Sequence, residues 1–247
     1  MKLLTKKWAE EYEQLRVIHW LKDFDAQQEN YEQIKKRSRD DYFYSIAADI
    51  VLAKAVLNNN LAEDFYQAKV NRDRKVLLSL PREVYGKIKD IKTLVLGYAC
   101  QEDKALLMSY ASELRIKLEK LSNTANEITE IAQDYLPEEF CVDDFVGELV
   151  YEEYIDGKNY VINIGGYEVC IENYFIMERD DFKINEWEEN NPLTLWTSLH
   201  AAELHYITDK CYELHLLLVD GDKFENMKFW NFTLRGTNIK YLNTDLD

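Results

Sequence analysis

Two copies of one tripeptide carry the side chains with the clearest capacity for chemistry in this sequence. Residues 203–205 and 213–215 both read Glu-Leu-His, and three of the chain's 4 histidines lie between positions 200 and 215. Imidazole nitrogens and carboxylate oxygens can hold zinc or iron, and they also serve as general acids and bases. The candidate metal ligands, with Zn or Fe as the candidate cofactor, are therefore Glu203, His205, Glu213 and His215.

Two simpler interpretations stand beside the metal site. Glu and His can pair across adjacent strands, where such a pair contributes about 0.2–1 kcal/mol. The same side chains could instead belong to a surface that binds a partner. The chain has no His-Glu-x-x-His segment and no cysteine pair near these residues. Cross-strand pairing is thus the favoured interpretation, and metal binding is the alternative.

Strand parity places both Glu/His pairs on one face of a predicted hairpin. Successive side chains of a strand point to opposite faces of a sheet. Leu214 and Leu216 therefore mark the core face of the second strand, and both Glu/His pairs lie on the opposite face if the turn occupies residues 208–211. His200 has the other parity and can join them only if a bulge intervenes.

The residues after Pro137 show the alternating pattern of β-strands. Asp156-Gly157 and Gly165-Gly166 are turn signals between Tyr- and Ile-rich runs, which predicts a three-stranded meander. Three more strands are expected over about residues 195–207, 211–220 and 227–242.

The residues before Pro137 show helical periodicity. Thr5 is expected to cap a first helix, and a buried helix is expected over residues 42–57. Another helix should precede a stop and restart at Pro81. The fold class is therefore α+β, with a helical bundle domain over residues 1–136 and an acidic antiparallel β-sheet domain over residues 137–247.

Leucine and alanine recur at heptad spacing in the last predicted helix, about residues 102–135. Leu107 and Leu114 begin this seam, and Ala111 occupies an intermediate position. The seam is expected to pack on other helices of the same chain. A coiled-coil dimer is the alternative, so a monomer or a weak homodimer is expected. Residues 122–124, Ser-Asn-Thr, could divide the helix into two pieces.

The net charge of −16 belongs entirely to the C-terminal part. Residues 1–136 hold 22 basic and 22 acidic residues, whereas residues 137–247 hold 8 basic and 24 acidic residues. Phosphates require a basic face, so nucleic acid is not expected as a partner. An acidic surface instead suits a basic protein. The candidate partner-binding residues combine acidic and aromatic side chains: Glu152, Glu153, Asp180, Asp181, Trp187, Glu188 and Glu189.

The sequence lacks the signals that mark several other classes of protein. No apolar run approaches the roughly 20 residues that cross a bilayer, so no membrane association is expected, and the first residues show no secretory signal. The 4 cysteines include no Cys-x-x-Cys pair, which suits a reducing cytoplasm. The chain contains no Gly-x-Ser-x-Gly elbow and no glycine-rich phosphate loop. A cytoplasmic location is expected.

Three segments resemble one bacterial family. They are "KLLTKKW" at residues 2–8, "LPREVYGKIKDIKTLVLGYA" at residues 80–99, and "CYELHLLL" at residues 211–218 with "FTLRGTNIKY" at residues 232–241. On these segments, which sample the whole chain, the sequence resembles the family catalogued as domain of unknown function 4085. The resemblance implies a bacterial, cytoplasmic setting, and it brings no known reaction, cofactor or catalytic residue.

The leading functional hypothesis is a non-enzymatic protein-interaction module that binds a basic protein through its acidic sheet face. It assigns no catalytic and no cofactor-binding residues. The alternative is a metal-dependent hydrolase with a Glu/His site on the hairpin at residues 203–215.

Overall fold

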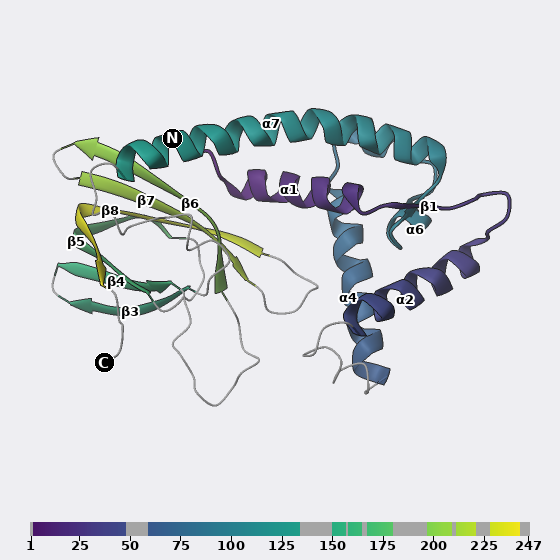
Figure 1. Cartoon of the computed structure of the whole chain (residues 1–247), viewed down its shortest axis with the longest axis horizontal. Coiled ribbons are helices and arrows are strands. Elements are labelled where there is room, and N and C mark those ends of the chain that lie inside the picture. The colour runs from purple at the N-terminus through teal and green to yellow at the C-terminus, as the bar shows by residue number, and fades with distance from the viewer. Residues whose placement is uncertain are drawn as a thin grey trace. The chain divides into compact units, whose positions relative to one another are not determined.

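The computed structural model describes residues 2–47, 59–133, 150–156, 158–164, 167–179, 197–208, 211–220 and 228–242. Within these ranges, helices form the first part of the chain and an antiparallel sheet forms the last part, which confirms the predicted α+β class (Figure 1). The helices are α1 (Lys6–His19), α2 (Tyr31–Ala47), α4 (Asn59–Leu78), α5 (Arg82–Tyr85), α6 (Ile91–Leu94) and α7 (Gln101–Gln133). The short strands β1 (Lys22–Asp23) and β2 (Tyr98–Ala99) pair in parallel.

The described residues fall into two compact units. The helical unit holds residues 10–118, and the sheet unit holds residues 2–9 together with the described residues from 119 onward. Helices α1 and α7 therefore each contribute residues to both units. The predicted domain boundary near Pro137 falls in residues 134–149, which lie outside the described residues.

Helix α7 confirms the prediction of one long helix. Leu107 and Ala111 of the heptad seam are buried in the core of the helical unit, where Leu77 and Val17 belong to the same cluster. Packing within the chain thus accounts for the heptad pattern. The helix continues through residues 122–124, so the predicted division there is wrong. The hydroxyl of Thr124 donates to the carbonyl oxygen of Lys120 and leaves the helical backbone bonds in place.

The other helices agree with the prediction in part. The Oγ1 atom of Thr5 accepts a hydrogen bond from the backbone amide of Trp8 at the start of α1, as expected. Helix α5 begins directly after Pro81, also as expected. Residues 42–47 of the buried helix predicted over residues 42–57 are helical, but they end α2, which begins at Tyr31, and Tyr44 is 85% exposed instead of buried. Residues 48–57 lie outside the described residues. Among the helices that the structure describes, none is long and apolar enough to cross a membrane.

Six antiparallel strands make the main sheet, in the order β3-β4-β5-β8-β7-β6. The strands are β3 (Val150–Asp156), β4 (Asn159–Ile164), β5 (Tyr167–Arg179), β6 (Thr197–Thr208), β7 (Cys211–Asp220) and β8 (Lys228–Leu242). Asp156 pairs with Asn159, and Ile164 pairs with Tyr167, so the chain reverses direction between the strands as the Asp-Gly and Gly-Gly dipeptides predicted. The predicted meander and the three later strands are thereby confirmed.

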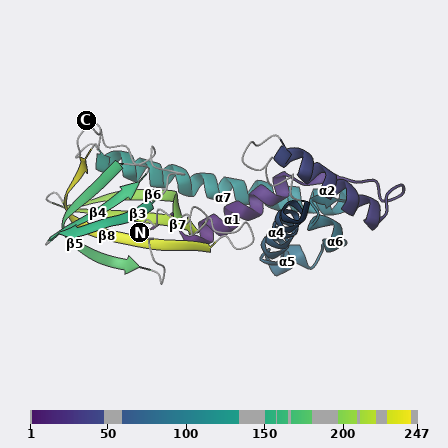
Figure 2. The same cartoon turned by 90° about the horizontal axis from the view of Figure 1, so that it is seen from below.

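The sheet packs its apolar side chains on one inner face. Leu214, Leu216 and Leu218 of β7 are buried there together with Phe232 of β8, and Ala132 of α7 belongs to the same core. Cα atoms of the two edge strands, β3 and β6, come within 8 Å of one another, so the sheet is curved (Figure 2). The opposite, outer face carries the predicted Glu/His pairs.

Candidate functional site

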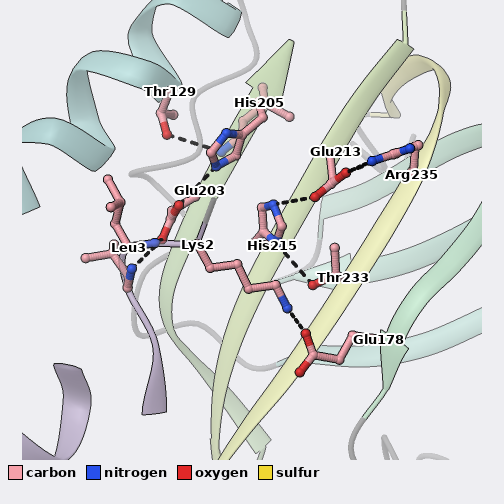
Figure 3. Close-up of polar contacts among 12 residues, drawn as sticks. Lys2, Leu3, Thr129, Glu178, Glu203, His205, Glu213, His215, Thr233 and Arg235 are labelled. Atoms are coloured by element: carbon pink, nitrogen blue, oxygen red, sulfur yellow. Dashed lines mark hydrogen bonds and ion pairs between the residues drawn. The ribbon is translucent and has the colours of Figure 1, made fainter. Parts of the chain in front are cut away.

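The four predicted Glu and His side chains form one compact group on the outer face (Figure 3). Glu203 lies directly across from His215, and His205 lies directly across from Glu213. The two imidazole rings meet edge to face, with 4.8 Å between their centroids. The common face predicted from strand parity is confirmed. We call these four residues the Glu/His cluster.

The Glu/His cluster is covered, although its side chains point away from the apolar core. Glu203 is 1% exposed and His215 is 7% exposed. Part of the covering layer is the segment of residues 2–9, which belongs to the sheet unit and which we call the N-terminal strap. The amide nitrogen of Leu3 in the strap donates to Glu203, 200 positions later in the chain. The outer face thus has a second layer of structure.

Glu203 fixes the strap through its carboxylate. Its Oε1 atom accepts hydrogen bonds from the adjacent backbone amides of Leu3, at 2.8 Å, and Leu4. Its Oε2 atom lies 3.0 Å from Nε2 of His205. Burial acts to raise the pKa of Glu203, but the hydrogen bonds from His205, Leu4 and Leu3 outweigh burial and hold that pKa below its ordinary value. Glu203 is therefore a buried anion at neutral pH.

His215 occupies the centre of the covered face. Its Nδ1 atom lies 3.1 Å from the hydroxyl of Thr233 on β8, and its Nε2 atom lies 2.9 Å from a carboxylate oxygen of Glu213. Burial lowers the pKa of His215 to about 4, and the neighbouring His205 acts in the same direction. The ring is therefore neutral at pH 7.

Glu213 is held by a cation from the next strand. Arg235 of β8 lies directly across from it, and both Nε, at 3.0 Å, and Nη2 of Arg235 donate to its carboxylate. Burial acts to raise the pKa of Glu213, but the bond to Arg235 outweighs it and the pKa lies below its ordinary value. Both carboxylates of the Glu/His cluster are thus ionised, and both accept hydrogen bonds from other groups of the chain.

A polar row continues from the cluster across four strands. Glu203, His215, Thr233 and Glu178 are successive cross-strand neighbours on β6, β7, β8 and β5. The side chain of Lys2 extends past His215 and forms an ion pair with Glu178 (Figure 3). The strap therefore contacts both ends of this row: its backbone amides bind Glu203 at one end, and its lysine binds Glu178 at the other.

The strap also has an apolar contact with the outer face. Leu4 and Trp8 pack against a buried cluster that contains Ala201 of β6 and Leu217 of β7. His200 is close by, with its ring 5.8 Å from the ring of Trp8. A register shift between Leu199 and Ala201 leaves His200 as the extra residue of a bulge. The bulge that the sequence analysis considered at His200 is therefore present. The ring of His200 lies beside Trp8 of the strap.

Both carboxylates of the cluster are engaged in hydrogen bonds within the chain, Glu203 with strap amides and Glu213 with Arg235. Within the ranges that the structure describes, no three His, Cys, Asp or Glu side chains are arranged to hold a metal ion. The imidazole Nε2 atoms of His205 and His215 each face a carboxylate, at 3.0 Å and 2.9 Å. Each of these contacts joins two residues of one strand, Glu203 with His205 in β6 and Glu213 with His215 in β7, so Glu–His pairing is present but runs along each strand and not across the hairpin as the sequence predicted.

The predicted partner-binding residues are described only in part. Glu152 and Glu153 lie in strand β3. The others, Asp180, Asp181, Trp187, Glu188 and Glu189, lie outside the described residues. The structure adds two apolar side chains on β5 that the sequence analysis did not single out: Phe175 is 64% exposed and Met177 is 44% exposed. Exposed Phe and Met side chains are enriched where proteins meet partners.

The sequence analysis also missed the strap residues, above all Lys2, Leu3 and Leu4. Their segment was noticed only as one of the three that carry the family resemblance. Comparisons with models of known families, with curated proteins and with solved structures gave no match to this chain. The resemblance to domain of unknown function 4085 therefore stays a prediction.

Proposed function

We propose that this chain is a non-enzymatic protein-interaction module of a bacterial cytoplasm, and that its acidic sheet region binds a cationic protein. The observation that carries the proposal is the distribution of charge. Residues 137–247 hold 24 acidic and 8 basic residues, a net charge of −16, whereas residues 1–136 are neutral. A charge of one sign on one part of a chain speeds encounter with a partner of the opposite sign.

Exposed apolar residues of strand β5 support this proposal. Phe175 lies directly across from Arg235, and Met177 immediately precedes Glu178. Aromatic, Met and Arg side chains among charged neighbours resemble the composition of protein interfaces. The alternative of a metal-dependent hydrolase gains no comparable support, since both carboxylates of the Glu/His cluster already bind other groups of the chain.

The proposal is tested by capture, identification and salt dependence. The full chain is immobilised and used to capture proteins from a bacterial lysate, and the captured protein is then purified. Its affinity is measured by calorimetry at about 50 mM and about 500 mM NaCl, where screening lengths differ about threefold. We expect a cationic protein whose affinity falls at least about tenfold at the higher salt concentration.

Matched charge variants locate the binding region. The test variant neutralises four candidate acids by Asp180→Asn, Asp181→Asn, Glu188→Gln and Glu189→Gln. The control variant neutralises four exposed acids of the helical region by Glu10→Gln, Glu32→Gln, Asp64→Asn and Glu113→Gln. Only the first variant should weaken binding. The proposal would be refuted by equal losses of affinity in the two variants, or by a partner whose affinity does not change with salt concentration.

A further inference from the structure

The N-terminal strap shows which kind of segment the outer face of the sheet binds. Residues 2–9, "KLLTKKWA", contain three lysines and no acidic residue. They belong to the unit that also holds the acidic sheet region. The strap is thus a short cationic segment that is already bound to this face.

Each kind of group in the strap has its own counterpart on the sheet. The amides of Leu3 and Leu4 both donate to one oxygen of Glu203, as two consecutive N–H groups can do toward a single anion. Lys2 pairs with Glu178. Leu4 and Trp8 pack on the apolar cluster around Leu217. The face therefore recognises a lysine, two adjacent backbone amides and apolar side chains, in that order along a chain.

The contacts of the strap differ in strength. The bonds to Glu203 involve a buried carboxylate, and they are strong because no water competes there. The ion pair of Lys2 with Glu178 is partly exposed, and such pairs contribute little. Leu4 and Trp8 are only partly buried. The strap is therefore held mainly through the amides of Leu3 and Leu4, and a competing segment could first displace the weaker contact of Lys2.

Apolar surface continues beyond the Lys2 end of the strap. Met177 precedes Glu178 on β5, and both Met177 and Phe175 remain exposed while the strap is in place. A longer ligand could cover these two side chains as well as the polar row. It would then bury more surface than the strap does, which provides a reason for exchange.

We propose that this outer face is a peptide-docking site that the N-terminal strap occupies in the isolated chain, and that a cationic partner docks there through a segment with a lysine, adjacent free amides and apolar side chains. This inference rests on the proposed function and specifies its partner and its site. The strap acts as an internal competitor. Its attachment to the same chain gives it an effective concentration of the order of millimolar, so ligands bind weakly until the strap is loosened.

The experiment uses the full chain and a labelled peptide. The probe is an acetylated peptide of residues 2–9 with a fluorophore at its C-terminal end, and binding is followed by fluorescence polarisation. Lys2→Glu places a carboxylate beside Glu178 and loosens the strap of the protein. Lys7→Glu is the control, because it makes the same charge change at an exposed position of the same segment. We expect the Lys2→Glu protein to bind the peptide at least about tenfold more tightly than the Lys7→Glu protein.

Two further measurements distinguish sequence-specific docking of the peptide from nonspecific attraction between opposite charges. A peptide of the same composition in scrambled order should not show the preference for the Lys2→Glu protein. Adding Glu203→Gln to Lys2→Glu should weaken binding of the native peptide at least about tenfold, since the amides lose their anionic acceptor. Thermal unfolding of each variant verifies that it is folded. Equal affinities for Lys2→Glu and Lys7→Glu, or equal binding of the scrambled peptide, overturn the inference.

Competition with the captured partner distinguishes this inference from the proposed function. If the partner binds in a salt-sensitive manner and an excess of the peptide does not displace it, the proposed function stands and the docking site is wrong. If the peptide binds as expected while no cationic protein is captured, the face binds peptides and the proposed function is wrong. Displacement of the partner by the peptide supports both.

Discussion

Because of His215, the stability of the sheet unit changes with pH. This change occurs at pH values above the range in which carboxylates titrate. Its pKa is about 4 in the folded chain, whereas an unfolded histidine has a pKa near 6.5. Between these two values the unfolded chain binds a proton that the folded chain does not. Stability is therefore unaffected well above pH 6.5, and it falls as the pH decreases toward 4.

The size of the effect follows from the two pKa values. Proton linkage lowers the free energy of unfolding by about 2 kcal/mol when the pH changes from 7 to 5. The ring is buried, so solvent screening reduces this figure little. Glu203 and Glu213 have pKa values below the ordinary value of 4.5, so their contributions are lost only at more acidic pH. A measurement at pH 5 therefore reports mainly on His215.

The assay must follow the sheet unit separately from the helical unit. The chain is equilibrated in urea at pH 7 and at pH 5, and a brief pulse of hydrogen exchange labels the amides that are unprotected at each urea concentration. Peptides from β6 and β7 then report the free energy of unfolding of that region. We expect the wild-type chain to lose about 2 kcal/mol between the two pH values.

Two variants show whether His215 is responsible. His215→Gln removes the titrating ring, so its loss between pH 7 and pH 5 should be smaller than that of the wild type by about 2 kcal/mol. His19→Gln removes an exposed histidine of α1 and should behave like the wild type. The reasoning is refuted if His215→Gln and the wild type show the same dependence on pH.

Two further substitutions test individual contacts. Glu203→Ala removes the acceptor of two strap amides and should lower the free energy of unfolding by about 3 kcal/mol in urea titrations. Glu178→Ala removes only the partner of Lys2 and should lower it by less than about 1 kcal/mol. Similar losses in the two variants would show that the strap is not held mainly through Glu203. Gly236→Ala would bring a methyl group within 2.7 Å of the carbonyl oxygen of Glu172, and closer still to a side-chain atom of β5. The variant should therefore lose about 2 kcal/mol of its free energy of unfolding. An unchanged midpoint of urea unfolding would show that β5 and β8 can move apart at this position.

The sequence was sufficient to predict those features of the fold that have a local pattern. The alternation around Leu214 fixed the inner face of β7, and with it the side on which His215 lies. The Asp-Gly turn after β3 and the heptads of α7 were equally local signals. In each case the predictive residues are neighbours along the chain or are separated by one period of a helix or strand.

The remaining features depend on contacts between distant residues. Nothing near Leu3 indicates that its amide binds a carboxylate 200 positions later. The start of α2 was also missed, since its buried residues Ile34 and Ser38 face the core while charged residues surround them. The polar cluster was recognised from the sequence, but the layer that covers it was not, because a covering segment leaves no periodic signal in the strands beneath it.

The contact between Leu3 and Glu203 also determines when this part of the molecule can be completed during translation. Synthesis proceeds at about 5–20 residues per second, so a separation of 200 residues corresponds to roughly 10–40 s. Throughout that interval the lysine-rich strap has been synthesised while its acceptor Glu203 has not. Strand β6 must therefore be synthesised before the strap can reach its final position, so this contact forms only after residue 203 has been made.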